Sequence, residues 1–319
     1  MTYTIRPFNP VQEEYEILVD LHNAYWPDRP DVARDWQMAD ERWNPKYLFQ
    51  RYVYEQDGTI VAFGQANESP WNYVEGQYHL EFHVHPEHLG QGIKQRLYEH
   101  IDQILRQHTP KPTSYAAYTR EDKEELVAFL KSLDFAIVQR EAVSEIDMDG
   151  FDPTPFASHA ERAKKNGIII YTLAELMEIC SDWRQRNYDL ILAIINEIPG
   201  PETSTPQPID EFYKIYDHPN YIPDGWFIAL DGEEWVGNSS LWKVSGQDDR
   251  LDVNVTGVLP SHRRKGIATA LKLKTFEYAL RHGVRYIKTG NEENNPMYDL
   301  NLMLGFKPKP GWLTFRKEL

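Results

Sequence analysis

The 319-residue sequence has almost no cysteine and no long hydrophobic run. Cys180 is the only cysteine, so a disulfide within the chain is excluded and a reducing compartment such as the cytoplasm is expected. The longest apolar runs, such as residues 190–195, are far shorter than the ~20 residues that span a bilayer. Residues 1–12 lack the basic segment and apolar stretch of a secretory signal. The sequence therefore predicts a soluble, cytoplasmic protein with no membrane partner.

An excess of basic residues is also missing. The chain has 34 Lys and Arg against 49 Asp and Glu, which gives a net charge of −15. The imbalance is uneven, with 14 basic and 26 acidic residues in 1–150 (14 − 26 = −12) and 20 and 23 in 151–319 (20 − 23 = −3). Nucleic-acid binding needs a concentrated basic surface, which neither half supplies overall, so no nucleic-acid partner is expected. The 41% of hydrophobic residues indicates a globular chain with sizeable cores.

Strand and helix signals alternate along both halves, as in an α/β protein. In the first half we expect strands at 3–8, 47–66, 78–85, 114–118 and 135–148, and helices at 93–105 and 122–133. In the second half we expect helices at 173–197, 208–216 and 264–282, and strands at 226–231, 235–244 and 251–259. Residues 149–155 have turn-forming composition, and the length suits about two domains. We therefore predict domains at 1–150 and 151–319.

The two halves contain a repeated pattern. Val84-x-Pro86-x-His88-(3)-Gly92-Ile93-(3)-Leu97 matches Val258-x-Pro260-x-His262-(3)-Gly266-Ile267-(3)-Leu271, with every pair 174 residues apart (258 − 84 = 174). Residues 129–135 resemble residues 300–306 at an offset of 171. Two matches in the same order and at nearly the same offset indicate a duplicated domain.

The second copy of this pattern has the chemistry of a phosphate site. A strand ends at Pro260, a basic loop of Arg263, Arg264 and Lys265 follows, and a helix begins at Gly266. Free backbone N–H groups at the start of a helix attract anions, and the helix dipole adds to this attraction. A basic turn that only caps the helix is the alternative interpretation of the loop taken alone.

The segment resembles motif A of the GNAT acetyltransferase superfamily, whose loop pattern is Arg/Gln-x-x-Gly-x-Gly/Ala. Arg263, Gly266 and Ala268 match this pattern. Downstream, the superfamily's motif B resembles Asn294-x-x-Met297-x-x-Leu300-Asn301-x-x-x-Gly305-Phe306. The whole layout is similar to tandem GNAT proteins, of which mycothiol synthase is one. The resemblance implies an α/β (α+β) fold of two tandem GNAT domains, each a mixed, mostly antiparallel sheet flanked by helices.

The resemblance also implies acetyl-CoA as co-substrate and a set of contacts for it. The pyrophosphate would lie on the backbone N–H groups of the loop, the pantetheine would pair with the preceding strand, and an amide near Val258 would hold the thioester oxyanion. The implied cofactor-binding residues are Val258, Leu259, Pro260, Arg263, Arg264, Lys265, Gly266, Ile267, Ala268, Thr269 and Asn294.

The first copy departs from the family pattern. Leu89 replaces the Arg/Gln, Lys94 replaces the final small residue, and Asp134 replaces the glycine of Gly-Phe. A bulky side chain at Lys94 is expected to crowd the pyrophosphate. At the 174 offset, Leu80 and Phe82 stand opposite Asn254 and Thr256. We therefore predict that the first domain is a degenerate GNAT domain, either a scaffold or a wall of the substrate site.

For catalysis, an amine near pKa ~10 must lose a proton before it attacks a thioester. Strand alternation predicts Asp252, Asn254 and Thr256 on one face, with Asp252 as the base and the other two holding water. A solvated aspartate at the strand edge is the alternative, and a bulge would change the alternation. Asn301 stands where the family often has a tyrosine acid, and Tyr298, one turn earlier, is the candidate substitute.

Two other groups of side chains carry weaker signals. His79, Glu81, His83 and His85 share an alternating strand face and could bind zinc, but a histidine-rich surface is the favoured interpretation, so no metal is predicted. Cys180 lies in an apolar context and is expected to be buried. The sequence thus predicts an acetyl-CoA-dependent N-acetyltransferase acting in the C-terminal domain on a primary amine, more readily a small molecule than a protein. A non-catalytic acyl-CoA-binding protein is the alternative.

Overall fold

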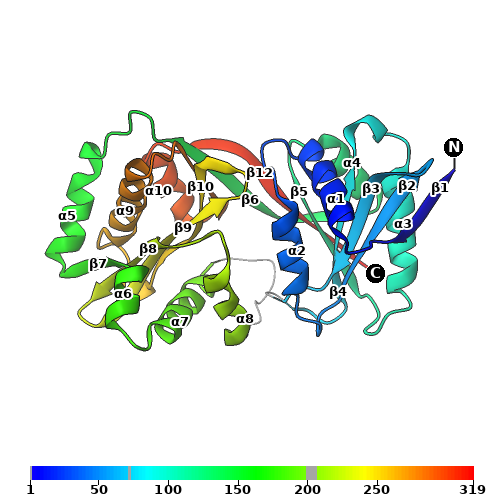
Figure 1. The fold of residues 1–319 in the computed structure, drawn as a ribbon. Helices are drawn as coiled ribbons and strands as arrows, with labels where there is room; N and C mark the ends of the chain where they lie inside the picture. Colours follow the sequence, from blue (N-terminus) through cyan, green and yellow to red (C-terminus); the bar gives the residue numbers. More distant parts are fainter. Residues whose placement is uncertain (1, 71–72, 199–206) are drawn as a thin grey trace. The chain divides into compact units, whose positions relative to one another are not determined.

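The computed structural model describes residues 2–70, 73–198 and 207–319, which form two compact units. Unit 1 holds the described residues up to Gln139 together with Leu313–Leu319, and unit 2 holds those from Arg140 to Trp312. The turn at residues 149–155 therefore lies inside unit 2. Each unit combines one mostly antiparallel sheet with helices, which confirms the predicted fold class (Figure 1).

Unit 1 is built on a sheet in the order β1-β2-β3-β4-β5, in which only β4 and β5 run parallel. Its elements in chain order are β1 (Tyr3–Pro7), α1 (Gln12–Tyr25), α2 (Ala33–Glu41), β2 (Phe49–Gln56), β3 (Thr59–Asn67), β4 (Gln77–Val84), α3 (Ile93–Leu105), β5 (Ser114–Arg120) and α4 (Glu124–Ser132). The sequence patterns did not predict α1 and α2.

Unit 2 repeats this layout with a sheet in the order β6-β11-β10-β9-β8-β7, in which only β10 and β11 run parallel. Its elements in chain order are β6 (Ala136–Asp147), whose first residues belong to unit 1, α5 (Ala157–Lys165), β7 (Ile168–Thr172), α6 (Leu173–Ile179), α7 (Trp183–Ile195), α8 (Ile209–Tyr213), β8 (Tyr221–Asp231), β9 (Glu234–Val244), β10 (Gln247–Val258), α9 (Ile267–Arg281), β11 (Tyr286–Glu292), α10 (Pro296–Met303) and β12 (Lys307–Glu318).

The helix predicted over residues 173–197 is two helices. A capping box begins α6, in which the Thr172 side chain accepts from the Glu175 N–H and the Glu175 carboxylate accepts from the Thr172 N–H. The break falls at Cys180–Asp182, and Asp182 stands at the N-cap of α7. Serine and aspartate favour helix starts over helix interiors, which explains the interruption.

The two repeats exchange their last strands. β6 follows α4 along the chain, yet it pairs with β11 of unit 2, with Ser144 opposite Thr289. β12 follows α10, but its residues from Leu313 onward belong to unit 1. There the Leu319 N–H donates to the Thr113 carbonyl at 3.0 Å, and Phe315 is fully buried. Each unit is therefore completed by a strand from the other repeat.

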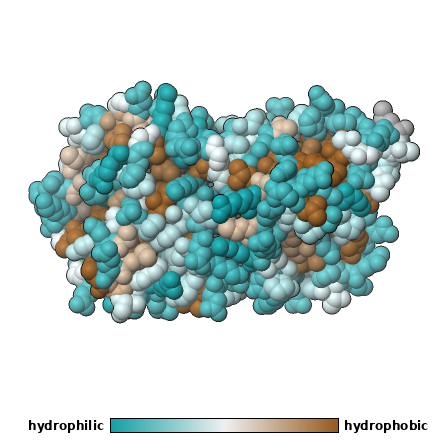
Figure 2. Space-filling view, in the orientation of Figure 1, coloured by the Kyte–Doolittle hydropathy of each residue, from teal (hydrophilic) through white to brown (hydrophobic). Residues whose placement is uncertain are grey.

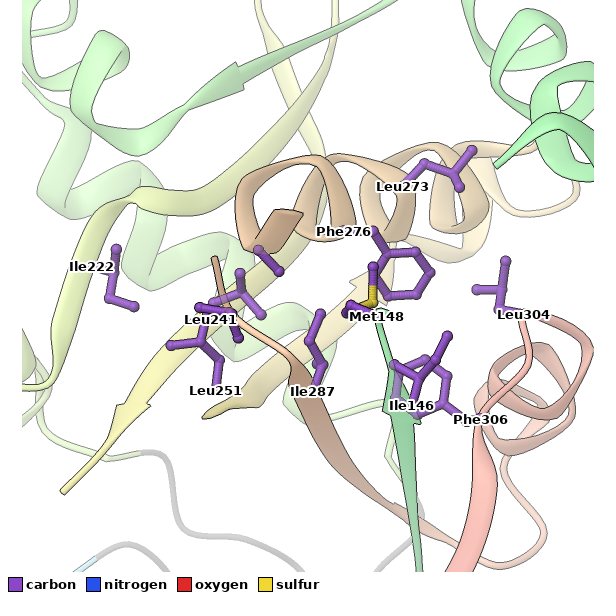
Figure 3. Close-up of a cluster of buried hydrophobic side chains, with 12 residues drawn as sticks. Ile146, Met148, Ile222, Leu241, Leu251, Leu273, Phe276, Ile287, Leu304 and Phe306 are labelled. Atoms are coloured by element: carbon purple, nitrogen blue, oxygen red, sulfur yellow. The ribbon is translucent and has the colours of Figure 1, made fainter. Parts of the chain in front are cut away.

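The core beside α9 shows which side of the unit 2 sheet each strand residue faces (Figure 3). Leu251 of β10 and Ile287 of β11 point toward Phe276 of α9. A second core on the opposite side of the sheet contains Ile191 and Ile194 of α7. These two cores define an α9 face and an α7 face of the sheet. On the side of the molecule seen in Figure 2, hydrophilic residues predominate at the surface, with apolar residues in separate patches.

Unit 1 contains a pair of neighbouring histidines in its core. His83 is buried, stacks on Phe63 with ring centroids 4.4 Å apart, and bonds through Nε2 to Glu81 Oε1 at 2.6 Å. The His22 ring lies 5.2 Å from His83. Burial, together with His83, lowers the pKa of His22 from 6.5 to about 4.

This shift predicts a loss of stability as the pH falls from about 6.5 to about 4, because the unfolded chain takes up the His22 proton first. Between pH 7 and pH 4 the free energy of unfolding should fall by about 3 kcal/mol more in the wild type than in His22→Asn, at ~1.4 kcal/mol for each pKa unit. Urea unfolding of both chains across this range measures the difference. Equal pH dependence in the two chains would contradict the assignment.

Candidate active site

The loop before α9 has an unusual backbone conformation. Arg264 and Gly266 both adopt left-handed conformations, with φ of 67° and 83°, and Gly266 caps α9. The Ala270 N–H makes the first bond of the helix, to the Gly266 carbonyl at 3.0 Å. The N–H groups of Gly266, Ile267, Ala268 and Thr269 therefore have no partner within the helix. The sequence predicted an anion site in this loop, and unpaired N–H groups at a helix start are the type of group that such a site uses.

Two of the three basic side chains of the loop already have acidic partners. The Arg263 guanidinium donates to Glu197 Oε2 at 3.0 Å and to the Val258 carbonyl at 3.2 Å. Lys265 Nζ lies 3.7 Å from Asp231 Oδ2, which also contacts His262 Nε2 at 3.1 Å. The remaining cation, Arg264, is exposed. These partly exposed pairs hold the loop in place at a small energetic cost to an incoming anion.

The strand that leads to the loop contains a β-bulge. Val253 pairs with Leu241 of β9, but Thr256 pairs with Ser239, so two residues of β10 face one residue of β9. Side chains of β9 bind the extra backbone: Asn238 Nδ2 donates to the Val255 carbonyl at 2.8 Å, and the Val255 N–H donates to Ser240 Oγ at 3.3 Å. Asn238 is buried and accepts in turn from the indole N–H of Trp226. Side-chain hydrogen bonds from β9 therefore stabilise the bulge.

The bulge overturns the prediction that Asp252, Asn254 and Thr256 share one face. Val253 packs in the core on the α9 face, whereas Val255 packs in the core on the α7 face. Thr256 bonds to Ser239 at 2.8 Å and so lies on the α9 face, opposite to Asp252. Because two consecutive residues occupy the space of one, the alternation changes sides between Val253 and Val255.

The bulge also corrects the repeat comparison. β4 and β10 begin their parallel pairs at Gln77 and Arg250, an offset of 173 (250 − 77 = 173), whereas Val84 and Val258 differ by 174. The second repeat therefore contains one inserted residue, and Leu80 corresponds to Val253 instead of Asn254. β4 pairs with β3 without any register shift, so unit 1 has no bulge at this place.

Pairing between β10 and β11 ends early. The last pair is Asp252 with Lys288, although β10 continues to Val258 and β11 to Glu292. The ladder therefore stops where the bulge begins, and this edge of β10 is available to pair with an extended ligand. Val258, Leu259 and Pro260 lie between this edge and the loop, where the sequence placed the pantetheine contacts.

The corresponding loop of unit 1 has the same backbone conformation but different side chains around it. Gly90 and Gly92 adopt the same left-handed conformations as Arg264 and Gly266, with φ of 75° and 73°. Lys94 is 5% exposed, and its ammonium pairs with Glu125 of α4. The lysine therefore bridges α3 and α4. The sequence had predicted that it would crowd a bound pyrophosphate.

The motif B residues considered from the sequence lie just before α10 and within it. Asn294 is exposed, and its side chain donates to Glu292 Oε1 at 2.9 Å. Tyr298 lies in the first turn of α10 and is partly buried. Asn301 is buried and donates to Asn291 Oδ1 at 2.7 Å, so this position holds a structural amide. Asp252 lies 3.5 Å from Lys288 Nζ.

One acidic residue near the uncovered edge of β10 was not predicted as a site residue from the sequence. The Glu141 carboxylate, from the exchanged strand β6, occupies the place that a side chain on Gly290 would take. Gly290 lies just beyond the last β10–β11 pair and, by alternation from Ile287, on the α7 face that carries Asp252. A glycine inside a strand marks a close approach of this kind, which is the signal the sequence offered.

The described residues contain no group of three or more His, Cys, Asp and Glu side chains that could hold a metal ion. His79 stacks on Tyr118 with ring centroids 5.7 Å apart, and Glu81 bonds to His83. Cys180 is half-buried and contacts Asp182 Oδ1 at 2.9 Å. Within the same described ranges, no helix is long and apolar enough to cross a membrane.

Comparisons with known proteins agree with this geometry. A model of the acetyltransferase (GNAT) family matches residues 13–135 and 191–306. A GCN5-related N-acetyltransferase from Sphaerobacter thermophilus has a similar fold, with a TM-score of 0.73 at 17% identity over 99% of this chain and 95% of that one. A tandem GNAT protein from the clavulanic acid biosynthesis pathway also gives 0.73, at 19% identity over 99% and 98%. A search of curated proteins gave no match.

The family model matches most of the chain, and it does so twice, once in each repeat. The two matched regions contain the two glycine loops, β4 with α3 and β10 with α9. The chain belongs to the GNAT acetyltransferase family and carries two GNAT regions in tandem.

Proposed function

We propose that unit 2 transfers the acetyl group of acetyl-CoA to a primary amine. Membership of the family supports acetyl transfer in general. The observation that carries the assignment to unit 2 is the combination of the bulge in β10 with the basic loop before α9. The early end of the ladder does not distinguish the two units, because β4 and β5 also pair only as far as Leu80 and Ala117. Unit 1 has neither the bulge nor the basic loop.

In this proposal the pyrophosphate binds the N–H groups of residues 266–269, and Arg263 exchanges Glu197 for phosphate. The pantetheine pairs with the edge of β10 that β11 leaves uncovered. An N–H near Val258 donates to the thioester oxygen, where negative charge develops during attack. The neutral amine attacks the carbonyl carbon, the C–N bond forms, the C–S bond breaks and coenzyme A leaves as the thiol. No covalent enzyme intermediate is needed. A thiol of pKa ~8.5 leaves with little help, so Tyr298 is a dispensable acid.

Two carboxylates are candidates for the base that accepts the amine proton, and both lie on the α7 face. Asp252 is the residue suggested by the sequence, and Lys288 neutralises part of its charge. Glu141 is exposed and lies beside Gly290, beyond the end of the ladder. Their negative charge also favours a cationic acceptor, which we propose to be a small-molecule amine.

A panel of small amines with acetyl-CoA, followed by release of the coenzyme A thiol, tests the proposed reaction. If Asp252 is the base, Asp252→Asn should lower kcat/KM by about 10²-fold or more. Glu141→Gln should then change kcat/KM only a few-fold. The reverse order would transfer the role to Glu141. Acetyl-CoA binding should be unchanged in both variants.

A non-catalytic acyl-CoA-binding protein is the second candidate, because Asn301 replaces the acid and is fixed in a structural bond. Tight acetyl-CoA binding without thiol release on any amine of the panel would favour it. Steady thiol release that depends on an amine would exclude it.

A further inference from the structure

Helix α5 lies beside the start of α9. Ala160 and Ala163 pack in the same core as Ile267 of α9. A Cβ atom on Gly266 would lie 2.5 Å from the His159 carbonyl oxygen and 3.4 Å from Arg162 Cβ. Just before α5 along the chain, Phe151 packs on Phe276, in the third turn of α9, with ring centroids 4.9 Å apart. The two helices therefore run in opposite directions, and the last turn of α5 flanks the anion-binding start of α9.

This last turn is strongly basic. It carries Arg162, Lys164 and Lys165, and Glu161 is the one acidic residue of the helix. Among the residues that the structure describes, these three cations make no ion pair, and neither does Arg264 of the loop. The Nδ1 atom of His159 is buried without a hydrogen-bond partner within those same ranges. In a chain of net charge −15, such uncompensated cations form a local field that attracts an anion.

The basic residues also exceed what α5 needs for its own stability. Cations in a last turn favour a helix through its dipole, but each contributes only about 0.3–1 kcal/mol when exposed. The position of Arg162 indicates a more specific role, because its Cβ would lie 3.4 Å from a Cβ atom added to Gly266. Axes of packed helices lie about 8–10 Å apart, so a long arginine side chain on α5 can reach a group bound at the start of α9.

We propose that Arg162, together with Arg264, binds the 3′-phosphate of coenzyme A. This inference rests on the proposed function, in which the pyrophosphate occupies the N–H groups at the start of α9. The 3′-phosphate is the second anionic group of the cofactor and is carried on the ribose next to that pyrophosphate. A guanidinium matches phosphate oxygens in a bidentate geometry that lysine cannot supply. Helix α5 thus makes the site selective for coenzyme A over its 3′-dephospho form.

Calorimetric titration with acetyl-CoA and with 3′-dephospho-acetyl-CoA tests this role. The wild type should bind acetyl-CoA about tenfold more tightly, as one charge-assisted phosphate contact predicts. Arg162→Gln should remove most of this preference by weakening acetyl-CoA alone. Lys164→Gln is the matched control, since residue 164 lies about 200° around the helix from residue 162, and it should keep the preference.

The outcomes separate the two proposals. If Arg162→Gln weakens both ligands equally, or neither, the 3′-phosphate assignment is wrong while the cofactor site stands. If Lys164→Gln removes the preference as fully as Arg162→Gln, the effect is one of general charge and the assignment is also wrong. If the wild type binds neither ligand, the proposed function fails and this inference fails with it.

Discussion

Gly266→Ala is expected to weaken acetyl-CoA binding on the order of 100-fold, as the loss of two charge-assisted hydrogen bonds predicts. The added Cβ would lie 2.5 Å from the His159 carbonyl, which is backbone and cannot rotate away. Either α5 or the loop must therefore move. Movement of the loop takes the N–H groups of residues 266–269 out of register with the pyrophosphate.

Gly92→Ala is the matched control, because Gly92 has the corresponding place and conformation in unit 1. There the nearest atoms to an added Cβ belong to the Arg96 side chain, at 3.8 Å or more. Both substitutions carry the cost of a left-handed alanine, about 1–2 kcal/mol of stability. Only Gly266→Ala should affect the cofactor. Equal losses of affinity in the two variants, or a larger loss in Gly92→Ala, would contradict the assignment of the site to unit 2.

Phe315→Ala is expected to destabilise unit 1 by about 3–5 kcal/mol, although the residue belongs to the second repeat. Phe315 is fully buried in the strand that unit 1 receives from β12. Nearby, Lys317 Nζ contacts the Tyr98 hydroxyl of α3 at 3.2 Å. Removing the ring leaves a cavity in a unit that the chain completes only with its last residues.

Hydrogen exchange resolved by segment tests this prediction. Phe315→Ala should reduce protection in β4, β5 and α3 of unit 1. Phe306→Ala is the control: it removes the same side chain nine positions earlier, from the core beside α9, and should reduce protection in unit 2. If Phe315→Ala instead reduced protection in unit 2 alone, the strand exchange would be wrong.

The sequence predicted those features that depend on local pattern. The glycines at 92 and 266 stand at helix starts in both repeats, and both adopt the left-handed conformation that glycine permits. The basic loop and the strand before it are also where the pattern placed them. A motif of fixed spacing records a backbone conformation directly, so it can be read without knowledge of the rest of the fold.

Features that depend on contacts between distant segments of the chain could not be predicted from local sequence patterns. The strand at 136–147 was expected and the strand at 307–318 was not, and nothing local tells which sheet either one joins. The bulge escaped because one inserted residue changes the repeat offset from 173 to 174 within a single strand. Its signal was indirect: Asn238 and Ser240 are polar residues in a buried strand, where they bind the extra backbone.

The uneven charge distribution along the chain follows the position of the proposed cofactor site. The near-neutral second half carries the basic loop and the basic end of α5, whereas the first half carries most of the acid excess. A net charge of −15 therefore does not exclude a polyanionic cofactor, since the field at one helix start is local.

We propose that the chain binds acetyl-CoA once, in unit 2. The stoichiometry of acetyl-CoA binding by calorimetry tests it most directly. We predict one molecule per chain, bound on the order of 100-fold more weakly in Gly266→Ala and with unchanged affinity in Gly92→Ala. Two molecules per chain, or one that survives Gly266→Ala and disappears in Gly92→Ala, would contradict the account.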